Sequence, residues 1–104
     1  MDSVDGDREL LQAVIEAFSQ EAPKLIEQGH AAIAGNDAKT LHRTGHTFKG
    51  ALLSLGANGP AEVSHTLEQL GAEGKIDAAK DQMAELVEVL DRVLKELSRF
   101  DPKA

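Results

Sequence analysis

An imidazole and an ammonium group stand three residues apart in this chain, at His46 and Lys49. In a helix, side chains three or four residues apart are neighbours on one surface. A neutral imidazole nitrogen is a competent nucleophile, and a cation one turn away can stabilise negative charge on a group that the imidazole holds. This pair is therefore the first candidate for chemistry in the sequence.

The helical pattern around this pair predicts that His46 faces water. The apolar positions of the stretch fall on one stripe that would face a core: Leu41, Gly45, Phe48, Leu52 and Leu55. His46 lies about 140° from the centre of that stripe. Gly50 and Leu53 share its outward face. An exposed glycine in a helix costs roughly 1 kcal/mol relative to alanine, so the bare backbone at Gly50 favours the close approach of another surface.

Composition limits the class of protein. A chain of 104 residues with 41% apolar residues has material for one core, so we expect a single domain over residues 1–104. The absence of cysteine excludes disulfides and thiol chemistry. The formal charge of −7 and the lack of Trp and Tyr argue against nucleic acid as a partner. Without a secretory signal or an apolar run of about 18 to 20 residues, we expect a soluble, cytoplasmic domain without membrane contact.

Helical periodicity and breaking residues predict five helices, over residues of about 7–20, 22–34, 37–55, 60–73 and 77–99. Asp7 and Asp37 are the expected N-caps of the first and third helices. Pro23 predicts a kink or a short break, because proline lacks the amide donor and disfavours helical geometry before it. Gly35-Asn36 should close the second helix with a left-handed residue.

The remaining glycine and proline residues predict where the later helices begin and end. The third helix should stop at Gly56, the fourth should fray out through Gly71 and Gly74, and Asp101-Pro102 should end the last. Two apolar stripes mark the expected inward faces of the first and last helices: Leu10, Leu11, Val14, Ile15 and Phe18 in the first, and Ala79, Met83, Leu86, Leu90, Val93, Leu97 and Phe100 in the last.

These elements predict an all-α fold: an antiparallel up-down-up-down four-helix bundle with an additional short N-terminal helix that caps one end. No segment has the period-two alternation of a strand. The heptad-like last helix could suggest a coiled-coil dimer, but its apolar face is widened by Val87 and Leu94 and suits burial inside a bundle, so we expect a monomer.

Three motifs together resemble the histidine-containing phosphotransfer (HPt) domain of bacterial multistep phosphorelays. They are His46-Thr47-Phe48-Lys49-Gly50, Leu55-Gly56-Ala57 downstream, and Leu67-Glu68 on the next helix. The resemblance covers nearly the whole chain. It implies that His46 carries the phosphoryl group, that Lys49 and Gly50 are its motif partners, and that Glu68 accepts a hydrogen bond from the ring of His46 or sits beside it.

The function that this resemblance implies is that of a phosphorelay carrier. His46 would accept a phosphoryl group from a receiver-domain aspartate and pass it to another receiver domain, while Lys49 stabilises the phosphoryl oxygens. His42, Gly50 and Leu53 would belong to the docking face. The implied partners are response-regulator receiver domains and a hybrid histidine kinase. The kinase could be a separate protein or part of the same full-length chain. In that second case the domain could be the cytoplasmic part of a membrane-bound kinase.

The chain is expected to be a carrier and not an enzyme. Its glycines never form a phosphate-cradling loop with Lys and Ser or Thr, so we expect no ATP site of its own. We also expect no cofactor in this chain, because the family leaves magnesium and the acidic residues of the reaction to the receiver partner.

Two other functions stay open at this point. The same bundle could be an interaction module that docks a receiver domain or a partner helix around Leu53 without phosphate chemistry. His42 and His46, one turn apart, could also bind a metal with His65 or Glu68 as a third ligand, but flanking Arg and Lys residues disfavour it and we expect no metal site. A single helical histidine is usually an ordinary surface residue, and His30 is expected to be one.

Overall fold

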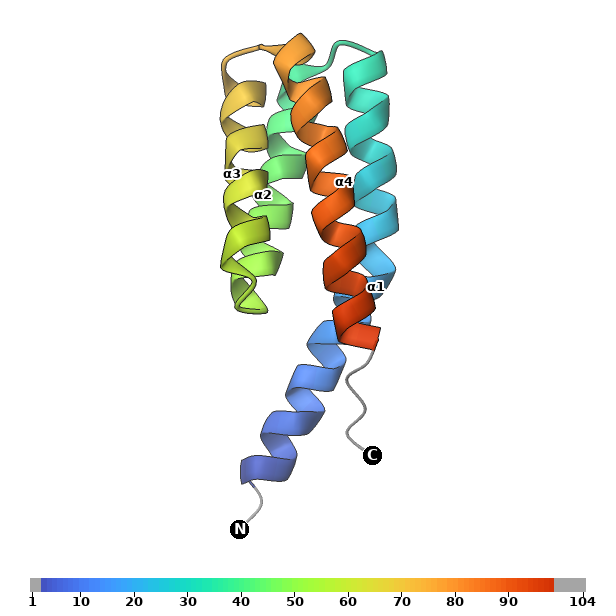
Figure 1. The fold of residues 1–104 in the computed structure, drawn as a ribbon, viewed down its shortest axis with the longest axis vertical. Helices are drawn as coiled ribbons and strands as arrows, with labels where there is room; N and C mark the ends of the chain where they lie inside the picture. Colours follow the sequence, from blue (N-terminus) through green and yellow to red (C-terminus); the bar gives the residue numbers. More distant parts are fainter. Residues whose placement is uncertain (1–2, 99–104) are drawn as a thin grey trace.

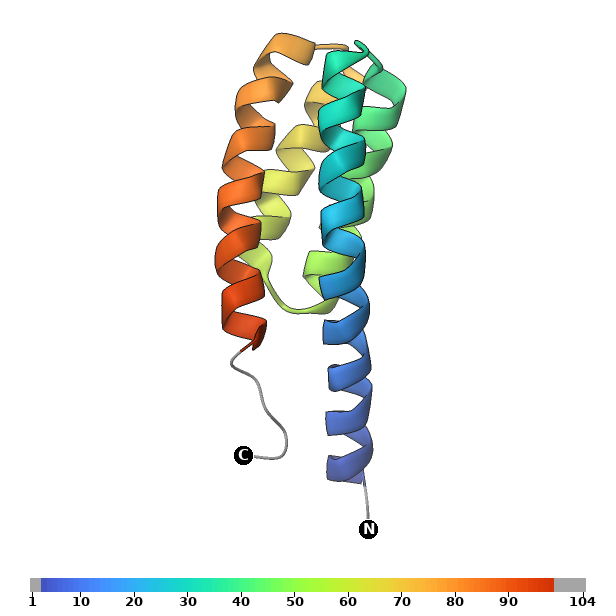
Figure 2. The same ribbon diagram turned by 90° about the vertical axis from the view of Figure 1, so that its right-hand side faces the viewer.

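The computed structural model describes the backbone of residues 3–98 and the side chains of residues 9–98, and this part of the chain is all helical. It contains four α-helices: α1 (Ser3–Ala34), α2 (Ala38–Ser54), α3 (Asn58–Ala72) and α4 (Ile76–Ser98). The expectation of an all-α fold is confirmed. In Figures 1 and 2, α1 and α3 run upward and α2 and α4 run downward in the bundle. No described helix is both long and apolar enough to cross a membrane.

The first two predicted helices form one continuous helix, so the prediction that a second helix begins near Pro23 is wrong. Pro23 lies inside α1, and Figure 1 shows that the helix changes direction along its length. A proline in a helix interior removes one backbone hydrogen bond and costs about 3 kcal/mol. Phe18, Ala22 and Leu25 are buried on both sides of it. Their packing against the other helices outweighs the loss.

The N-terminal part of α1 projects beyond the bundle and does not form a separate helix that caps it (Figures 1 and 2). Because α1 begins at Ser3, Asp7 lies within the helix and is not its N-cap, contrary to the prediction. Leu10 and Leu11, which we expected in the core, are 65% and 40% exposed. Among the described residues, no other helix lies beside this end of α1 (Figures 1 and 2), so the apolar stripe becomes half-buried only at Val14 and buried at Ile15.

The short connections follow the predicted turn chemistry, with one exception. Asn36 takes the left-handed conformation (φ 57°), and Gly56 and Gly74 do so after α2 and α3 (φ 75° and 71°). Asp37 caps α2, accepting a hydrogen bond from the Thr40 amide at 3.1 Å. Hydrogen bonds from Thr40 also lower the pKa of Asp37. The exception is Gly71, where we expected fraying, because it is buried inside α3.

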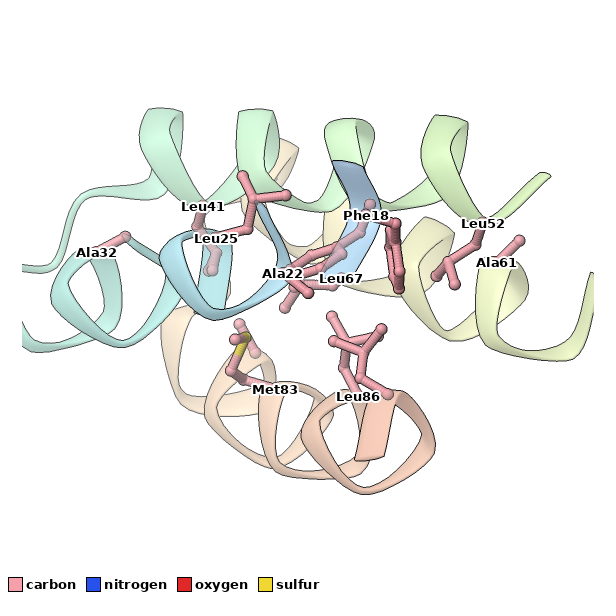
Figure 3. Close-up of a cluster of buried hydrophobic side chains, with 13 residues drawn as sticks. Phe18, Ala22, Leu25, Ala32, Leu41, Leu52, Ala61, Leu67, Met83 and Leu86 are labelled. Atoms are coloured by element: carbon pink, nitrogen blue, oxygen red, sulfur yellow. The ribbon is translucent and has the colours of Figure 1, made fainter. Parts of the chain in front are cut away.

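The core lies between all four helices. Figure 3 shows Phe18 of α1, Leu52 of α2 and Leu86 of α4 among the side chains that meet there. The predicted inward positions of α2 and α4 supply most of the fully buried large side chains: Leu41, Phe48, Leu52, Met83, Leu86 and Leu90. Phe100, the last position of the predicted stripe, and Asp101-Pro102 lie outside the described residues. Since one face of α2 is held in this core, its opposite face is presented to solvent.

Candidate functional site

His46 lies on the solvent face of α2, as its spacing from the apolar stripe predicted. Its side chain is 66% exposed. Its Nδ1 atom lies 3.0 Å from Oε2 of Glu68 on α3, a residue 22 positions further along the chain. One ring nitrogen is therefore engaged with a carboxylate at the α2–α3 boundary, and most of the ring remains open.

Lys49 lies one turn after His46 and reaches the same carboxylate. Its Nζ atom is 2.8 Å from Oε1 of Glu68, and its side chain is 26% exposed. The two oxygens of Glu68 are thus divided between the two α2 side chains. The predicted pairing of His46 with Lys49 on one surface is present, and Glu68 is the residue that joins them.

The Glu68 carboxyl group is strongly biased towards its ionised form. Its side chain is only 13% exposed, and this burial alone would raise its pKa. The contacts of the carboxylate with Lys49 and His46, and the charge of the Lys49 ammonium, outweigh burial and lower the pKa of Glu68 from 4.5 to about 2. Glu68 is therefore an anion at neutral pH.

Two more histidines surround Glu68. Nε2 of His42 lies 3.6 Å from Oε2, and Nδ1 of His65 lies 3.5 Å from Oε1. His42, which the sequence predicts for the docking face, lies on α2 at its boundary with α3. His65 enters the sequence prediction only as a possible metal ligand, although its spacing of three residues from Glu68 on one helix already indicates that the two side chains are neighbours.

Gly50 and Leu53 form the open part of the face around His46. A Cβ atom built on Gly50 would meet no atom within 4 Å, and Leu53 is 54% exposed. On the side away from Glu68, a hollow of about 310 Å³ lies between α1 and α2, lined by these residues: Val14, Ala17, Phe18, Glu21, Leu25, Thr47, Ala51 and Ser54. The exposed histidine thus stands between a charged cluster on α3 and a mostly apolar hollow against α1.

A metal site at His42 and His46, with His65 or Glu68 as a third ligand, is the alternative that the sequence leaves open. Among the side chains that the structure describes, in residues 9–98, no group of three or more His, Asp or Glu is arranged so that it could hold a metal ion. His30 lies exposed on α1, as expected of an ordinary surface histidine.

The fold and this site together define a class: a helical bundle that presents one exposed histidine beside a lysine and an ionised carboxylate. The family model described as Hpt domain matches residues 13–96. The chain therefore belongs to the Hpt family, whose domains are histidine phosphocarriers of two-component phosphorelays and interact with receiver domains and kinases. Neither the curated proteins nor the solved structures that were compared with the chain gave a match.

Proposed function

We propose that His46 accepts a phosphoryl group from the aspartyl phosphate of one receiver domain and passes it to the aspartate of another. The observation that carries this proposal is the contact between Nδ1 of His46 and Glu68 at 3.0 Å, made by a side chain that is otherwise 66% exposed. Family membership supports the carrier role in general, and this contact supports His46 as the acceptor residue and Nε2 as its reactive atom.

The contact with Glu68 selects the tautomer of His46. An ionised carboxylate only accepts hydrogen bonds, so Nδ1 must carry the proton and donate it to Oε2. In the neutral ring the lone pair then lies on Nε2. Because Glu68 is an anion at neutral pH, this tautomer is favoured whenever the ring is neutral. Nε2, on the far side of the ring from Nδ1, is the nucleophilic atom.

Transfer to His46 is a displacement at phosphorus. The lone pair of Nε2 forms the N–P bond, the P–O bond of the aspartyl phosphate breaks, and the receiver carboxylate leaves with the bonding electron pair. The proton on Nδ1 stays in place, so the phosphorylated ring carries a positive charge. Glu68 faces that charge at 3.0 Å and stabilises it. Attack by the carboxylate of a second receiver domain reverses these steps.

Lys49 supplies positive charge near the transferred group. Its ammonium is anchored by Glu68 at 2.8 Å but remains partly exposed, one helical turn from His46. A lysine side chain has a flexible stem and three donors, so it can contact phosphoryl oxygens while it stays close to the carboxylate. In this reaction catalysis is mainly positioning and charge stabilisation, which these two residues provide from the carrier side.

The docking surface consists of Gly50, Leu53 and the hollow between α1 and α2. Backbone without a side chain at Gly50 lets the receiver domain bring its phosphoaspartate over His46, and Leu53 offers apolar contact area. We propose that this chain needs no cofactor of its own, because the receiver domain supplies magnesium and the acidic residues. In this role the domain is a substrate of kinase and receiver domains, without an ATP site.

The test is phosphoryl transfer from a phosphorylated receiver domain to wild-type, His46→Gln and His30→Gln proteins. His30→Gln is the matched control, because it also removes an exposed helical histidine. We expect an acid-labile, base-stable phosphate on the wild type and on His30→Gln, and none on His46→Gln, with the same helical circular dichroism for all three. Labelling of His46→Gln at the wild-type rate would show that another residue is the acceptor.

A second candidate function is supported by the exposure of Leu53. A leucine that is 54% exposed beside an apolar hollow suits a module that binds a receiver domain or a partner helix without phosphate chemistry. The same experiment separates the two functions. A pure interaction module would bind the receiver domain and remain unlabelled even in its wild-type form.

A further inference from the structure

The backbones of α2 and α3 lie in close contact at two glycines, Gly45 and Gly71, and Gly45 directly precedes His46. A Cβ atom built on Gly45 would lie 2.6 Å from the amide nitrogen and 2.9 Å from Cα of Glu68, and 3.0 Å from the carbonyl oxygen of Ser64. All three are backbone atoms. No change of side-chain rotamer can therefore make room for a side chain at position 45, and only a displacement of α3 can do so.

Glu68 contacts α2 in two ways: its backbone rests on Gly45, and its carboxylate reaches His46 and Lys49. Glu68 lies against α2 through its amide and Cα, and its side chain extends along the boundary to contacts of 3.0 Å and 2.8 Å. Both contacts are near the optimum for a hydrogen bond or ion pair and weaken steeply with distance. The separation of the two helices at this level is therefore matched to the reach of one glutamate side chain.

We propose that Gly45 is a positioning residue of the phosphotransfer site. Its missing side chain sets the α2–α3 separation at which Glu68 can hold the Nδ1–H tautomer of His46 and anchor Lys49. The predicted effect of Gly45 on the transfer rate rests on the proposed function of His46. The predicted effect on the His46 tautomer does not. Any residue larger than glycine at this position moves the Glu68 backbone away and lengthens both contacts.

The experiment compares Gly45→Ala with Gly29→Ala. Gly29 is also a buried helical glycine, and a Cβ atom there would lie 2.7 Å from Cε of Met83. That clash is with the flexible end of a side chain on α4, so it perturbs the core without moving α3. The readouts are the tautomer of His46, from two-bond ¹H–¹⁵N correlations of the imidazole ring, and the initial rate of phosphoryl transfer from a receiver domain.

We expect wild-type and Gly29→Ala proteins to show the Nδ1–H tautomer of neutral His46, and Gly45→Ala to show a mixture of tautomers. Transfer to Gly45→Ala should slow on the order of tenfold, while Gly29→Ala stays near the wild-type rate. In a Glu68→Ala background, Gly45→Ala should cause no further loss of rate, because residues that act through one contact are not additive. An equal loss with and without Glu68 overturns the proposal.

Glu68→Asp tests the same idea without a clash. The shorter side chain withdraws the carboxylate from His46 and Lys49 by one methylene, as a displacement of α3 would. Glu68→Asp should therefore show the mixed tautomers and slower transfer even if Gly45→Ala does not fold. Retention of the wild-type tautomer by Glu68→Asp, or by folded Gly45→Ala, refutes the positioning role. Failure of the wild type to accept phosphate would instead refute the proposed function, and the tautomer measurement would still decide the role of Gly45.

Discussion

Glu68 on α3 places Oε2 3.0 Å from Nδ1 of His46 on α2. This contact joins α2 and α3 through the imidazole of His46, and it favours the tautomer that carries the proton on Nδ1. Its other oxygen holds Lys49, so one carboxylate organises both residues of the motif.

The ion pairs of Glu68 should make the stability of the protein depend on pH at the acidic end. The pKa of Glu68 in the folded protein, about 2, is below its ordinary value of 4.5. A lowered pKa means that the stabilisation is complete above about pH 4.5 and is lost as the pH falls towards 2. We expect wild type to be more stable than Glu68→Gln by on the order of 1 kcal/mol at neutral pH, with the difference vanishing near pH 2.

Urea unfolding of both proteins across this pH range measures the difference. Glu62→Gln, which changes an exposed glutamate of the same helix, is the matched control and should follow the wild-type curve. A difference between wild type and Glu68→Gln that stays constant down to pH 2 would contradict the assignment of the ion pairs.

Replacing Lys49 by alanine should affect transfer more than stability. The ammonium–carboxylate contact is partly buried, but His46 still contacts the carboxylate after the change, so the free energy of unfolding should fall by only about 1 kcal/mol. Transfer should slow about tenfold or more, because positive charge near the phosphoryl oxygens acts in the transition state. Lys39→Ala, at an exposed lysine near the start of the same helix that does not pair with Glu68, should transfer at the wild-type rate. If both variants transfer equally well, Lys49 has no role in the reaction.

A leucine at position 50 should block docking without harming the fold. A Cβ atom at Gly50 meets no atom within 4 Å, and leucine favours a helix over glycine by roughly 1 kcal/mol. Gly50→Leu should therefore be at least as stable as wild type, yet bind a receiver domain at least about tenfold more weakly by calorimetric titration. Gly59→Leu, at another open glycine, is the control. Equal affinity of Gly50→Leu and wild type would remove the argument that Gly50 provides close approach.

Replacing Pro23 by alanine should stabilise the protein. Pro23 lies exposed in the interior of α1, where an alanine amide restores the hydrogen bond to the preceding turn. We expect the free energy of unfolding to rise by about 1 to 3 kcal/mol. Pro60→Ala should have a smaller effect, because Pro60 lies in the first turn of α3, where no such bond is lost. A destabilised Pro23→Ala would mean that the bend itself is required for packing.

The exposed leucines of α1 show where sequence periodicity misleads. Leu10 and Leu11 continue the stripe of Ile15 and Phe18, and the pattern alone predicts that all four are buried. Periodicity reports which face of a helix is apolar, but burial requires a neighbouring helix at the same height. The residues matched by the family model begin at 13, so the projecting turns lie outside it.

The sequence by itself determined what lies along single helices. The spacing of apolar residues predicted that Phe48 is buried and His46 exposed, and a spacing of three residues placed Lys49 beside His46. Asp37 and Asn36 marked the start of one helix and the end of another. These features follow from local geometry, because the rise and rotation per residue of a helix are nearly constant.

Only the tertiary structure decided what happens between helices. It showed that α1 continues through Pro23, that His65 joins the surroundings of Glu68, and that Gly45 lets the backbone of Glu68 rest against α2. The distance between two helices depends on the side chains of both and on the core that presses them together, which no pattern within one segment contains. Helix spacing therefore predicted which histidine is exposed, and helix packing decided which of its ring nitrogens faces Glu68.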